Sequence, residues 1–289
     1  MQKLSQKKIV RPPQHQQKPG KQSAMKPIPV SDDRTKLGTG KLKNKIALIS
    51  GADSGIGKAV ALLFAKEGAT IGIAYLNEHS DAKQTKKEIE QQYGQTAILL
   101  PGDISKEQHC IAIIKKMVKN FGRIDILVNN AAVQYENKDL LALSSRELIK
   151  TFETNIFSFF WLSKASLPFM KKGSCIINTS SVTAYRGSAV LIDYASTKGA
   201  IVSFTRSLAA SLIKKGIRVN GVAPGPVWTP LIASGYKKNK VAQHGSDSPM
   251  GRSAEPVEIA PSYLFLASED ASYMTGQVLH PNGGEIING

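Results

Sequence analysis

One glycine-rich stretch near residue 50 indicates the class of fold: Ser50-Gly51-Ala52-Asp53-Ser54-Gly55-Ile56-Gly57. It follows the apolar run Ile46–Ser50 directly and opens an amphipathic segment, Gly55–Glu67. Glycines at this spacing let the backbone turn tightly and approach a pyrophosphate, whose charge then lies at the positive end of the helix. Because the glycines stand between a buried strand and a helix, the stretch predicts a binding site for a dinucleotide or a related phosphate ligand.

Beyond this loop, short apolar runs alternate with longer amphipathic segments. Most runs are apolar at consecutive positions, which is typical of strands buried on both faces. The expected strands are Ile46–Ser50, Thr70–Tyr75, Ala97–Leu100, Ile124–Val128, Cys175–Thr179, Ile217–Val222 and Gln277–His280. The expected helices are Gly55–Glu67, Glu78–Tyr93, Lys106–Phe121, Ser145–Met170, Ile192–Lys215 and Ala254–Ala267. This alternation predicts an α/β fold with a single Rossmann-type, doubly wound parallel sheet of about seven strands and helices on both faces.

Composition excludes several classes of protein. With 289 residues, 42% of them hydrophobic, the chain can bury a core and is neither disordered nor a small disulfide scaffold. Cys110 and Cys175 belong to no Cys or His cluster, and the five histidines show no metal spacing, so no metal is expected. A reducing cytoplasm is the expected location. No stretch is apolar enough for a membrane span or a signal peptide, so we expect no membrane partner.

The net charge of +16 is concentrated at the N-terminus. Residues 1–40 contain nine Lys or Arg against two Asp and are rich in Gln and Pro, a composition that predicts an extended arm unable to fold alone. We interpret this arm as a solvated tail that packs loosely on the protein, with a targeting or an anion-binding arm as alternatives. The sequence shows no basic, aromatic-studded face, so no nucleic-acid partner is expected. The Rossmann-type domain is expected over residues 41–289.

The end of the second strand selects the cofactor in such a fold. There an acid binds the ribose 2′-hydroxyl of NAD, whereas a base accommodates the 2′-phosphate of NADP. Tyr75, Leu76 and Asn77 stand at this position and satisfy neither rule. Glu78 disfavours a 2′-phosphate if it points inward, but it is equally explained as a solvated acid at a helix N-terminus. The sequence therefore leaves NAD and NADP open.

A Tyr and a Lys four residues apart on one helix face can supply the proton for hydride chemistry, since the ammonium lowers the pKa of the phenol. Two such pairs occur, Tyr194/Lys198 and Tyr236/Lys240. The second lies in a polar, glycine-containing segment where its Lys is one of several solvated cations. The first follows a buried strand that ends in Ser181, at the sheet edge where ligands bind. We therefore predict Tyr194/Lys198 as the functional pair.

With these residues in place, the sequence resembles the short-chain dehydrogenase/reductase family in its single-domain branch. The N-terminal extension and the regions 185–194 and 222–231 resemble its bacterial general-stress or glucose-dehydrogenase-like subgroup. Ser50 replaces the family's usual Thr and Ala132 its usual Gly, which affects only local packing. The matching positions, in the family's order over about residues 41–285, are the glycine loop, Asp103, Asn129-Asn130-Ala131-Ala132, Asn155, Ser181, Tyr194, Lys198 and Pro224–Thr229.

The resemblance implies a catalytic centre of four residues. Tyr194 would be the general acid in reduction and the base in oxidation, while Lys198 would lower its pKa and bind the nicotinamide ribose. Ser181 would bind the substrate oxygen, and Asn155 would hold a water of the proton relay. Taken alone, Asn155 is also explained as a helix cap or kink, and Asn130 as a turn residue at a strand end.

The implied cofactor is NAD or NADP, and the implied assembly is a homo-oligomer, a tetramer by resemblance. The residues expected to bind the cofactor are Gly51, Asp53, Ser54, Gly55, Ile56, Gly57, Tyr75, Asp103, Ile104, Asn130, Ala131, Tyr194, Lys198, Pro224, Gly225, Val227 and Thr229.

We therefore expect an oxidoreductase that transfers hydride between NAD(P) and a small alcohol or carbonyl compound, such as an aldehyde, a ketone or a sugar. A 3-oxoacyl-carrier reductase-like activity and a non-catalytic NAD(P)-sensing protein are the alternatives. The substrate pocket is expected from Val182–Ile192 and from Pro226–Pro249, a loop-like segment able to close as a lid. The aromatic run at Phe157, Phe159, Phe160 and Trp161 is expected to pack into the core or a subunit interface.

Overall fold

A computed structural model describes residues 8–287. Seven parallel strands form one sheet in the order β3-β2-β1-β4-β5-β6-β7, which confirms the predicted α/β fold. The strand bounds are β1 (Ile46–Ser50), β2 (Thr70–Tyr75), β3 (Ala97–Pro101), β4 (Ile126–Asn129), β5 (Cys175–Thr179), β6 (Arg218–Val222) and β7 (Val278–Leu279). Each lies within two residues of its predicted position at either end, because an apolar run bounded by polar or turn residues marks a strand buried on both faces.

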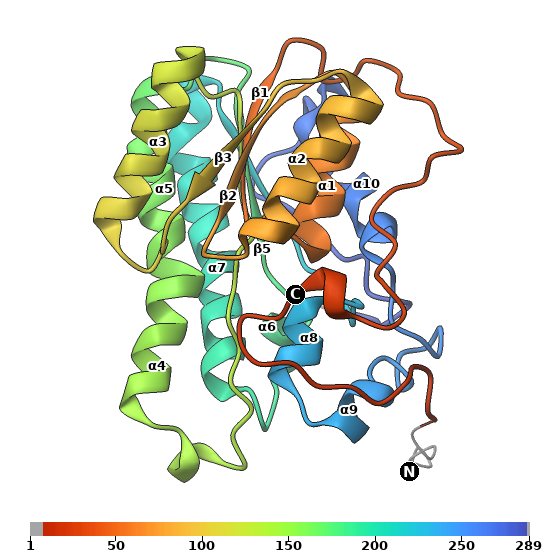
Figure 1. Cartoon of the computed structure of the whole chain (residues 1–289). Helices are drawn as coiled ribbons and strands as arrows, with labels where there is room; N and C mark the ends of the chain where they lie inside the picture. Colours follow the sequence, from red (N-terminus) through yellow and green to blue (C-terminus); the bar gives the residue numbers. More distant parts are fainter. Residues whose placement is uncertain (1–7, 288–289) are drawn as a thin grey trace.

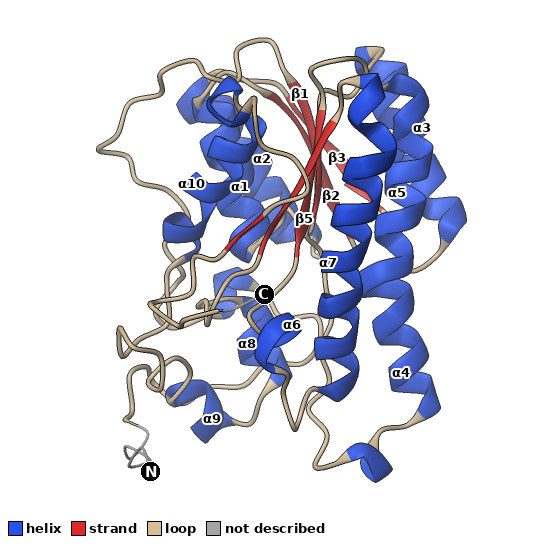
Figure 2. Ribbon diagram, turned by 180° about the vertical axis from the view of Figure 1, so that it is seen from behind, coloured by secondary structure: helices blue, strands red, loops and turns tan. Residues whose placement is uncertain are grey.

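Helices cover both faces of the sheet, as Figure 2 shows. Helices α1 (Gly55–Lys66), α2 (His79–Tyr93) and α10 (Pro256–Ala267) lie on one face, and α3 (Glu107–Phe121), α5 (Ser158–Ser166) and α7 (Ile192–Leu212) lie on the other. Side chains of β1 alternate between the two layers. Ala47 and Ile49 join the core cluster that contains α1 and α10, whereas Ile46 and Leu48 join the one that contains α3 and α7. Two apolar cores therefore hold the sheet from both sides.

Short elements complete the chain and depart from prediction. The segment expected to be one helix over Ser145–Met170 is divided into α4 (Ser145–Phe152), a π-helical turn (Glu153–Phe157), α5 and a 3-10 turn (Leu167–Phe169). The segment expected to be loop-like contains two helices, α8 (Pro230–Gly235) and α9 (Lys238–Ala242), which are too short to show a periodicity. The remaining short elements are α6 (Thr183–Arg186) and 3-10 turns at Gln22–Ala24, Leu140–Ala142, Ile213–Lys215 and Glu269–Ala271.

The N-terminal arm, described here from residue 8 to residue 40, first runs past α9 and α8 at the carboxyl ends of the strands (Figure 1). It then passes α10 and reaches the end of α1, where the Thr39 N–H donates to Glu67. Met25 is only 1% exposed and packs with Trp228 and Ile232. The indole Nε1 of Trp228 donates a hydrogen bond of 2.9 Å to the backbone oxygen of Pro27. The expectation of a loosely packed tail is therefore wrong for these residues, because a few buried side chains anchor an otherwise extended and polar segment. Lys3 and Lys7, two of its basic residues, lie outside the described residues.

The part of the chain that the structure describes bears on three expectations, which concern membrane spans, metal sites and cysteines. None of its helices combines the length and the apolar character that crossing a membrane requires. No group of three or more His, Cys, Asp or Glu side chains there is arranged to hold a metal ion. The thiols of Cys110 and Cys175 are buried and free.

Candidate active site

A cavity of about 500 Å³ opens at the carboxyl ends of the strands. It lies at the junction of β1 and β4, where the strand order reverses, which is the ligand-binding position of doubly wound sheets. The structure brings all the predicted site residues to this cavity except Gly57 and Asn155, which are buried behind it. Those that line it are Gly51, Asp53, Ser54, Gly55, Ile56, Tyr75, Asp103, Ile104, Asn130, Ala131, Ser181, Tyr194, Lys198, Pro224, Gly225, Val227 and Thr229.

The glycine loop leaves the start of α1 open toward the cavity. Gly51 has φ of +69°, a conformation that disfavours any side chain. A Cβ added to Gly57 would stand 2.0 Å from the Gly51 oxygen, so only glycine lets the first turn of α1 pack under the loop. Ser54, the residue before α1, makes no side-chain cap. The Gly55 N–H is bonded to the Gln22 side chain. The other backbone N–H groups of the first turn and the positive dipole end fit the pyrophosphate of a dinucleotide.

A hydrogen-bond network around Asn130 forms the floor of the cavity. The Ser50 hydroxyl accepts hydrogen bonds from the backbone N–H groups of Asn130 (2.9 Å) and Ala131 (3.1 Å). The Asn130 amide donates to the Ser50 oxygen at 3.0 Å and accepts from the Thr179 hydroxyl at 3.3 Å. These bonds join the ends of β1, β4 and β5. Serine at position 50 thus keeps the hydroxyl on which the junction depends.

Acidic side chains gather beyond the end of β2. Glu78 is buried and lines the cavity, and its Oε1 atom has no hydrogen-bond partner. Asp53, 7% exposed, lines the same region; burial, together with nearby Glu78 and Asp81, raises its pKa to about 7 against the opposing hydrogen bond from Ser54. The Glu78 carboxylate thus points inward, which the sequence left undecided.

Asp103, expected to bind the cofactor, follows β3 at the same end of the cavity. Its carboxylate accepts hydrogen bonds from the Ser105 backbone at 3.0 Å and from Lys150 Nζ at 3.2 Å. Burial alone would raise the pKa of Asp103, but the bonds from Ser105 and Lys150 outweigh burial and lower it. The side chain is therefore an oriented hydrogen-bond acceptor.

Ser181, Tyr194 and Lys198 meet on the opposite side of the cavity. Tyr194 lies in the first turn of α7, and the Lys198 Nζ lies 5.3 Å from the centre of its ring. Lys198 donates a hydrogen bond of 2.8 Å to the Thr179 oxygen, and burial lowers its pKa to about 7. The pKa of Tyr194 is raised by burial and by Tyr236, and a hydrogen bond with Ser181 opposes that rise. In this structure burial therefore outweighs the lowering that the Tyr/Lys spacing predicts.

Asn155 occupies the π-helical turn between α4 and α5 and is fully buried. Its side chain accepts a hydrogen bond from the Val133 N–H at 2.8 Å and donates one to the Val133 oxygen at 2.9 Å. It also donates to the Thr197 hydroxyl at 3.3 Å. A π turn inside a helix is frequent at functional sites. Here it aims an amide at the segment after β4, which borders the cavity.

Sequence reasoning did not name several residues of the cavity lining, among them Lys18 and Gln134, whereas Tyr236 lies in the segment 226–249 that was expected at the substrate pocket. Tyr236 was expected in a solvated loop, yet it is 8% exposed and burial raises its pKa to about 12. It reaches the cavity because α8 folds over it. No sequence signal marks Lys18, because the arm that carries it has no periodicity.

Fold and cavity together define a Rossmann-type oxidoreductase that depends on NAD(P). A family model described as enoyl-(acyl carrier protein) reductase matches residues 51–285. The chain belongs to the short-chain dehydrogenase/reductase family, as its sequence resemblance indicated.

Several bacterial and plant proteins are similar to the chain over nearly its whole length. It is 56% identical to the uncharacterized oxidoreductase YhdF of Bacillus subtilis, over 96% of each chain. It is 50% identical to General stress protein 39 of B. subtilis, over 93% of this chain and 94% of that one, which confirms the subgroup resemblance. It is 49% identical to NADPH-dependent aldehyde reductase 1, chloroplastic, of Arabidopsis thaliana, over 95% of this chain and 97% of that one.

Solved structures show the same fold. A short-chain dehydrogenase from Burkholderia cenocepacia in complex with NADP has a TM-score of 0.79 at 27% identity, covering 84% of this chain and 98% of that one. A short-chain dehydrogenase/reductase of Brucella melitensis, described as a glucose/ribitol dehydrogenase, has a TM-score of 0.78 at 31% identity, covering 86% and 99%.

Proposed function

We propose that this protein interconverts a small carbonyl compound, an aldehyde or a sugar, and its alcohol, with proton transfer at Tyr194. The observation that carries this proposal is that Tyr194 and Ser181 line the same cavity as the glycine loop. The names of two similar proteins support the substrate class: one is an NADPH-dependent aldehyde reductase and the other a glucose/ribitol dehydrogenase.

Each residue of the cavity has a separate role in the proposed reaction. When bound, the nicotinamide supplies or accepts the hydride. The Ser181 hydroxyl holds the carbonyl oxygen, and the Tyr194 phenol gives that oxygen a proton in reduction and removes it in oxidation. Lys198 favours the phenolate while its ammonium is protonated. The glycine loop, Asp103, Asn130 and residues 224–229 would hold the dinucleotide.

We further propose that NAD(H) is preferred over NADP(H). At the end of β2 the cavity presents the buried carboxylate of Glu78, whose free Oε1 can accept a hydrogen bond from a ribose 2′-hydroxyl. A 2′-phosphate there would face the Glu78 carboxylate, and like charges at short distance repel by about 1 kcal/mol or more.

The cofactor preference predicts the behaviour of one variant. Wild type should have a lower KM for NADH than for NADPH, and Glu78→Gln should reduce that discrimination by about tenfold. Glu90→Gln is the matched control, since Glu90 lies on α2 but is exposed and paired with Lys86. Initial rates at varied NADH and NADPH measure the ratio. A wild-type enzyme that prefers NADPH would contradict this part of the proposal.

A substrate screen tests the activity itself. Aldehydes, sugars, secondary alcohols and acetoacetyl-coenzyme A should be offered with both cofactors, and we expect turnover of at least one aldehyde or sugar. Activity confined to acetoacetyl-coenzyme A would favour the 3-oxoacyl-carrier alternative. Binding of NADH without any turnover would leave the non-catalytic sensor.

We also propose a homotetramer. Several large apolar side chains of α4, the π turn and α5 are exposed on one chain, including Ile149 (56%), Phe160 (50%) and Phe157 (44%). Light scattering should give four times the chain mass of 31.2 kDa, and Phe160→Glu should lower it. A wild-type mass of one chain would contradict the proposal.

We also propose a cytoplasmic location, because both cysteines are reduced. The thiols of Cys110 and Cys175 are buried and free, and burial raises the pKa of Cys175 to about 11. Such thiols need no oxidising compartment. Cell fractionation with an antibody against the chain would test this.

A further inference from the structure

The N-terminal arm forms part of the wall of the catalytic cavity. Lys18, Pro19 and Gly20 line the same cavity as Tyr194. The backbone fits closely there, because a Cβ added to Gly20 would stand 2.6 Å from the oxygen of Pro230, the first residue of α8. The Gln16 N–H donates to the Ala233 oxygen at 2.9 Å. The arm is therefore joined to the helix that covers the site.

A second contact fixes the arm against the glycine loop. The Gln22 side chain is buried, and its Oε1 accepts a hydrogen bond of 2.8 Å from the Gly55 N–H. The Gln22 N–H in turn donates to the Asp81 carboxylate at 2.6 Å. The segment that carries Lys18 is thus bonded to α8 before Lys18, through Gln16, and to the glycine loop after it, through Gln22. The position of Lys18 therefore follows from the anchored backbone on either side of it.

The Lys18 side chain is exposed as a whole, but its ammonium lies against the segment after β4. Its Nζ donates a hydrogen bond of 2.7 Å to the Gln134 backbone oxygen and lies 3.8 Å from the centre of the Tyr135 ring. Burial lowers the pKa of Lys18, and Glu147 and Asp193 oppose that shift. An ammonium has three N–H donors, and the carbonyl takes only one of them.

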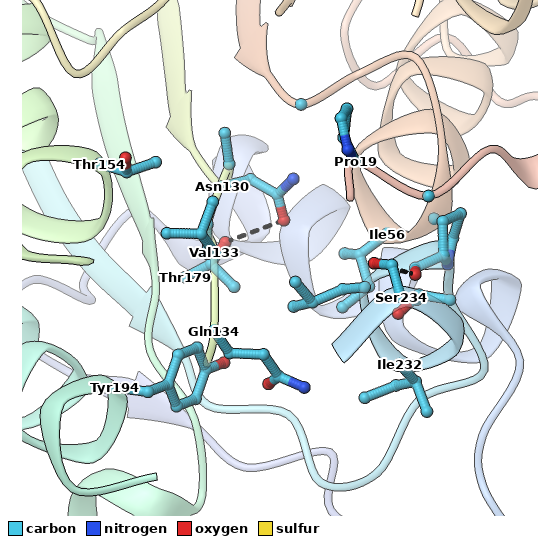
Figure 3. A pocket seen from close by; sticks show the side chains of 18 of the residues that line it. Pro19, Ile56, Asn130, Val133, Gln134, Thr154, Thr179, Tyr194, Ile232 and Ser234 are labelled. Carbon is cyan, nitrogen blue, oxygen red and sulfur yellow. Dashed lines mark hydrogen bonds between the residues drawn. The ribbon is translucent and has the colours of Figure 1, made fainter. Parts of the chain in front are cut away.

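Gln134 adds an unused donor next to this cation. Its side chain is 3% exposed, and its Nε2 atom has no hydrogen-bond partner. Figure 3 shows the amide extending into the cavity from the segment after β4, beside Tyr194. An interaction between the Gln134 side chain and the Tyr236 phenol lowers the pKa of Tyr236 against its rise by burial, but its geometry falls outside that of a full hydrogen bond. A buried amide donor without a partner is costly, so this atom fits a ligand that accepts hydrogen bonds.

Carboxylates line only one end of the cavity among the described residues, and there Lys150 pairs with Asp103. The carboxylates that line it, Asp53, Glu78 and Asp103, follow β1, β2 and β3 and so lie on one half of the sheet. Tyr194, Ser181 and Lys198 follow β5, on the other half, and Lys18 bonds the segment after β4 on that same half. The reacting end of the cavity is therefore rich in donors and positive charge and has no lining carboxylate among the described residues.

We propose that Lys18 Nζ and Gln134 Nε2 form a subsite for a carboxylate on the carbonyl substrate, so that the arm supplies a specificity-determining residue. This inference rests on the proposed function, since it assumes that the carbonyl group reacts at Tyr194. The substrate class it selects is an aldehyde that carries a carboxylate at its far end.

Two pairs of aldehydes test the subsite at two separations: succinic semialdehyde against butanal, and 4-carboxybenzaldehyde against its methyl ester. In Lys18→Met we expect KM to rise about tenfold for at least one carboxylate, with kcat and the neutral partner unchanged within about twofold. Gln134→Met should act in the same direction. Lys21→Met is the control, since Lys21 is also an exposed lysine of the arm but does not line the cavity, and it should change neither. Equal shifts for both members of each pair, or no shift in either pair, would overturn the inference.

A binding measurement separates this inference from the proposed reaction. Titration calorimetry with 4-(hydroxymethyl)benzoate, in the presence of NADH, needs no turnover. Wild type should bind it about tenfold more tightly than Lys18→Met does. Equal affinities would refute the subsite even if the neutral aldehydes are reduced. A tenfold difference would support it even if none of the four aldehydes is a substrate.

Discussion

Tyr194→Phe should lower turnover by at least about 100-fold, the usual scale for a general acid. The substitution removes one oxygen and keeps the ring, so the packing of α7 against the cavity stays intact. Among the described tyrosines, only Tyr194 has a hydrogen bond with Ser181 that lowers its pKa. Absorbance of the reduced nicotinamide measures kcat, and fluorescence titration of NADH should give a Kd close to that of wild type.

Tyr236→Phe is the matched control for this variant. Tyr236 lines the same cavity, is also buried and also stands four residues before a lysine. Lys240 lies 4.5 Å from the centre of the Tyr236 ring but is paired with Glu136, whereas Lys198 is buried and bonded to the Thr179 oxygen at the end of β5. We expect Tyr236→Phe to keep turnover within a few-fold. If Tyr194→Phe stayed that close to wild type, or if Tyr236→Phe were the more damaged enzyme, the assignment of the general acid would be wrong.

The sheet and the glycine loop could be read from the sequence because both depend on local rules. A strand buried on both faces must be apolar at consecutive positions, as in Ile46–Ser50, and the loop needs glycine where a Cβ would collide, as at Gly57. The order of Ser181, Tyr194 and Lys198 along β5 and α7 follows from the same alternation. These residues therefore come together once the parallel sheet is formed.

The cover of the site could not be read in this way. Helix α8 has six residues and begins at a proline, so it shows no apolar period, and Tyr236 after it looked solvated. The inward direction of Glu78 depends on the packing of the segment after β2, which no residue pattern encodes. The packing of the arm could not be predicted for a related reason. Its average composition is polar, and that average does not show that a single residue such as Met25 is buried.

Met25→Ala tests whether that arm belongs to the folded unit. Met25 is 1% exposed and packs with Trp228, Ile232, Ala233 and Tyr236, the residues around α8. Truncating a buried methionine to alanine costs about 2–5 kcal/mol of unfolding free energy, because the transfer energy is lost and a cavity is left.

Leu37→Ala is the control, since Leu37 lies in the same arm and is 90% exposed. Urea unfolding should shift to a lower midpoint for Met25→Ala with an unchanged m-value, while Leu37→Ala stays within about 0.5 kcal/mol of wild type. An arm that unfolds separately would instead give equal midpoints for both variants, and α8 would then have to be held over the cavity by the domain alone.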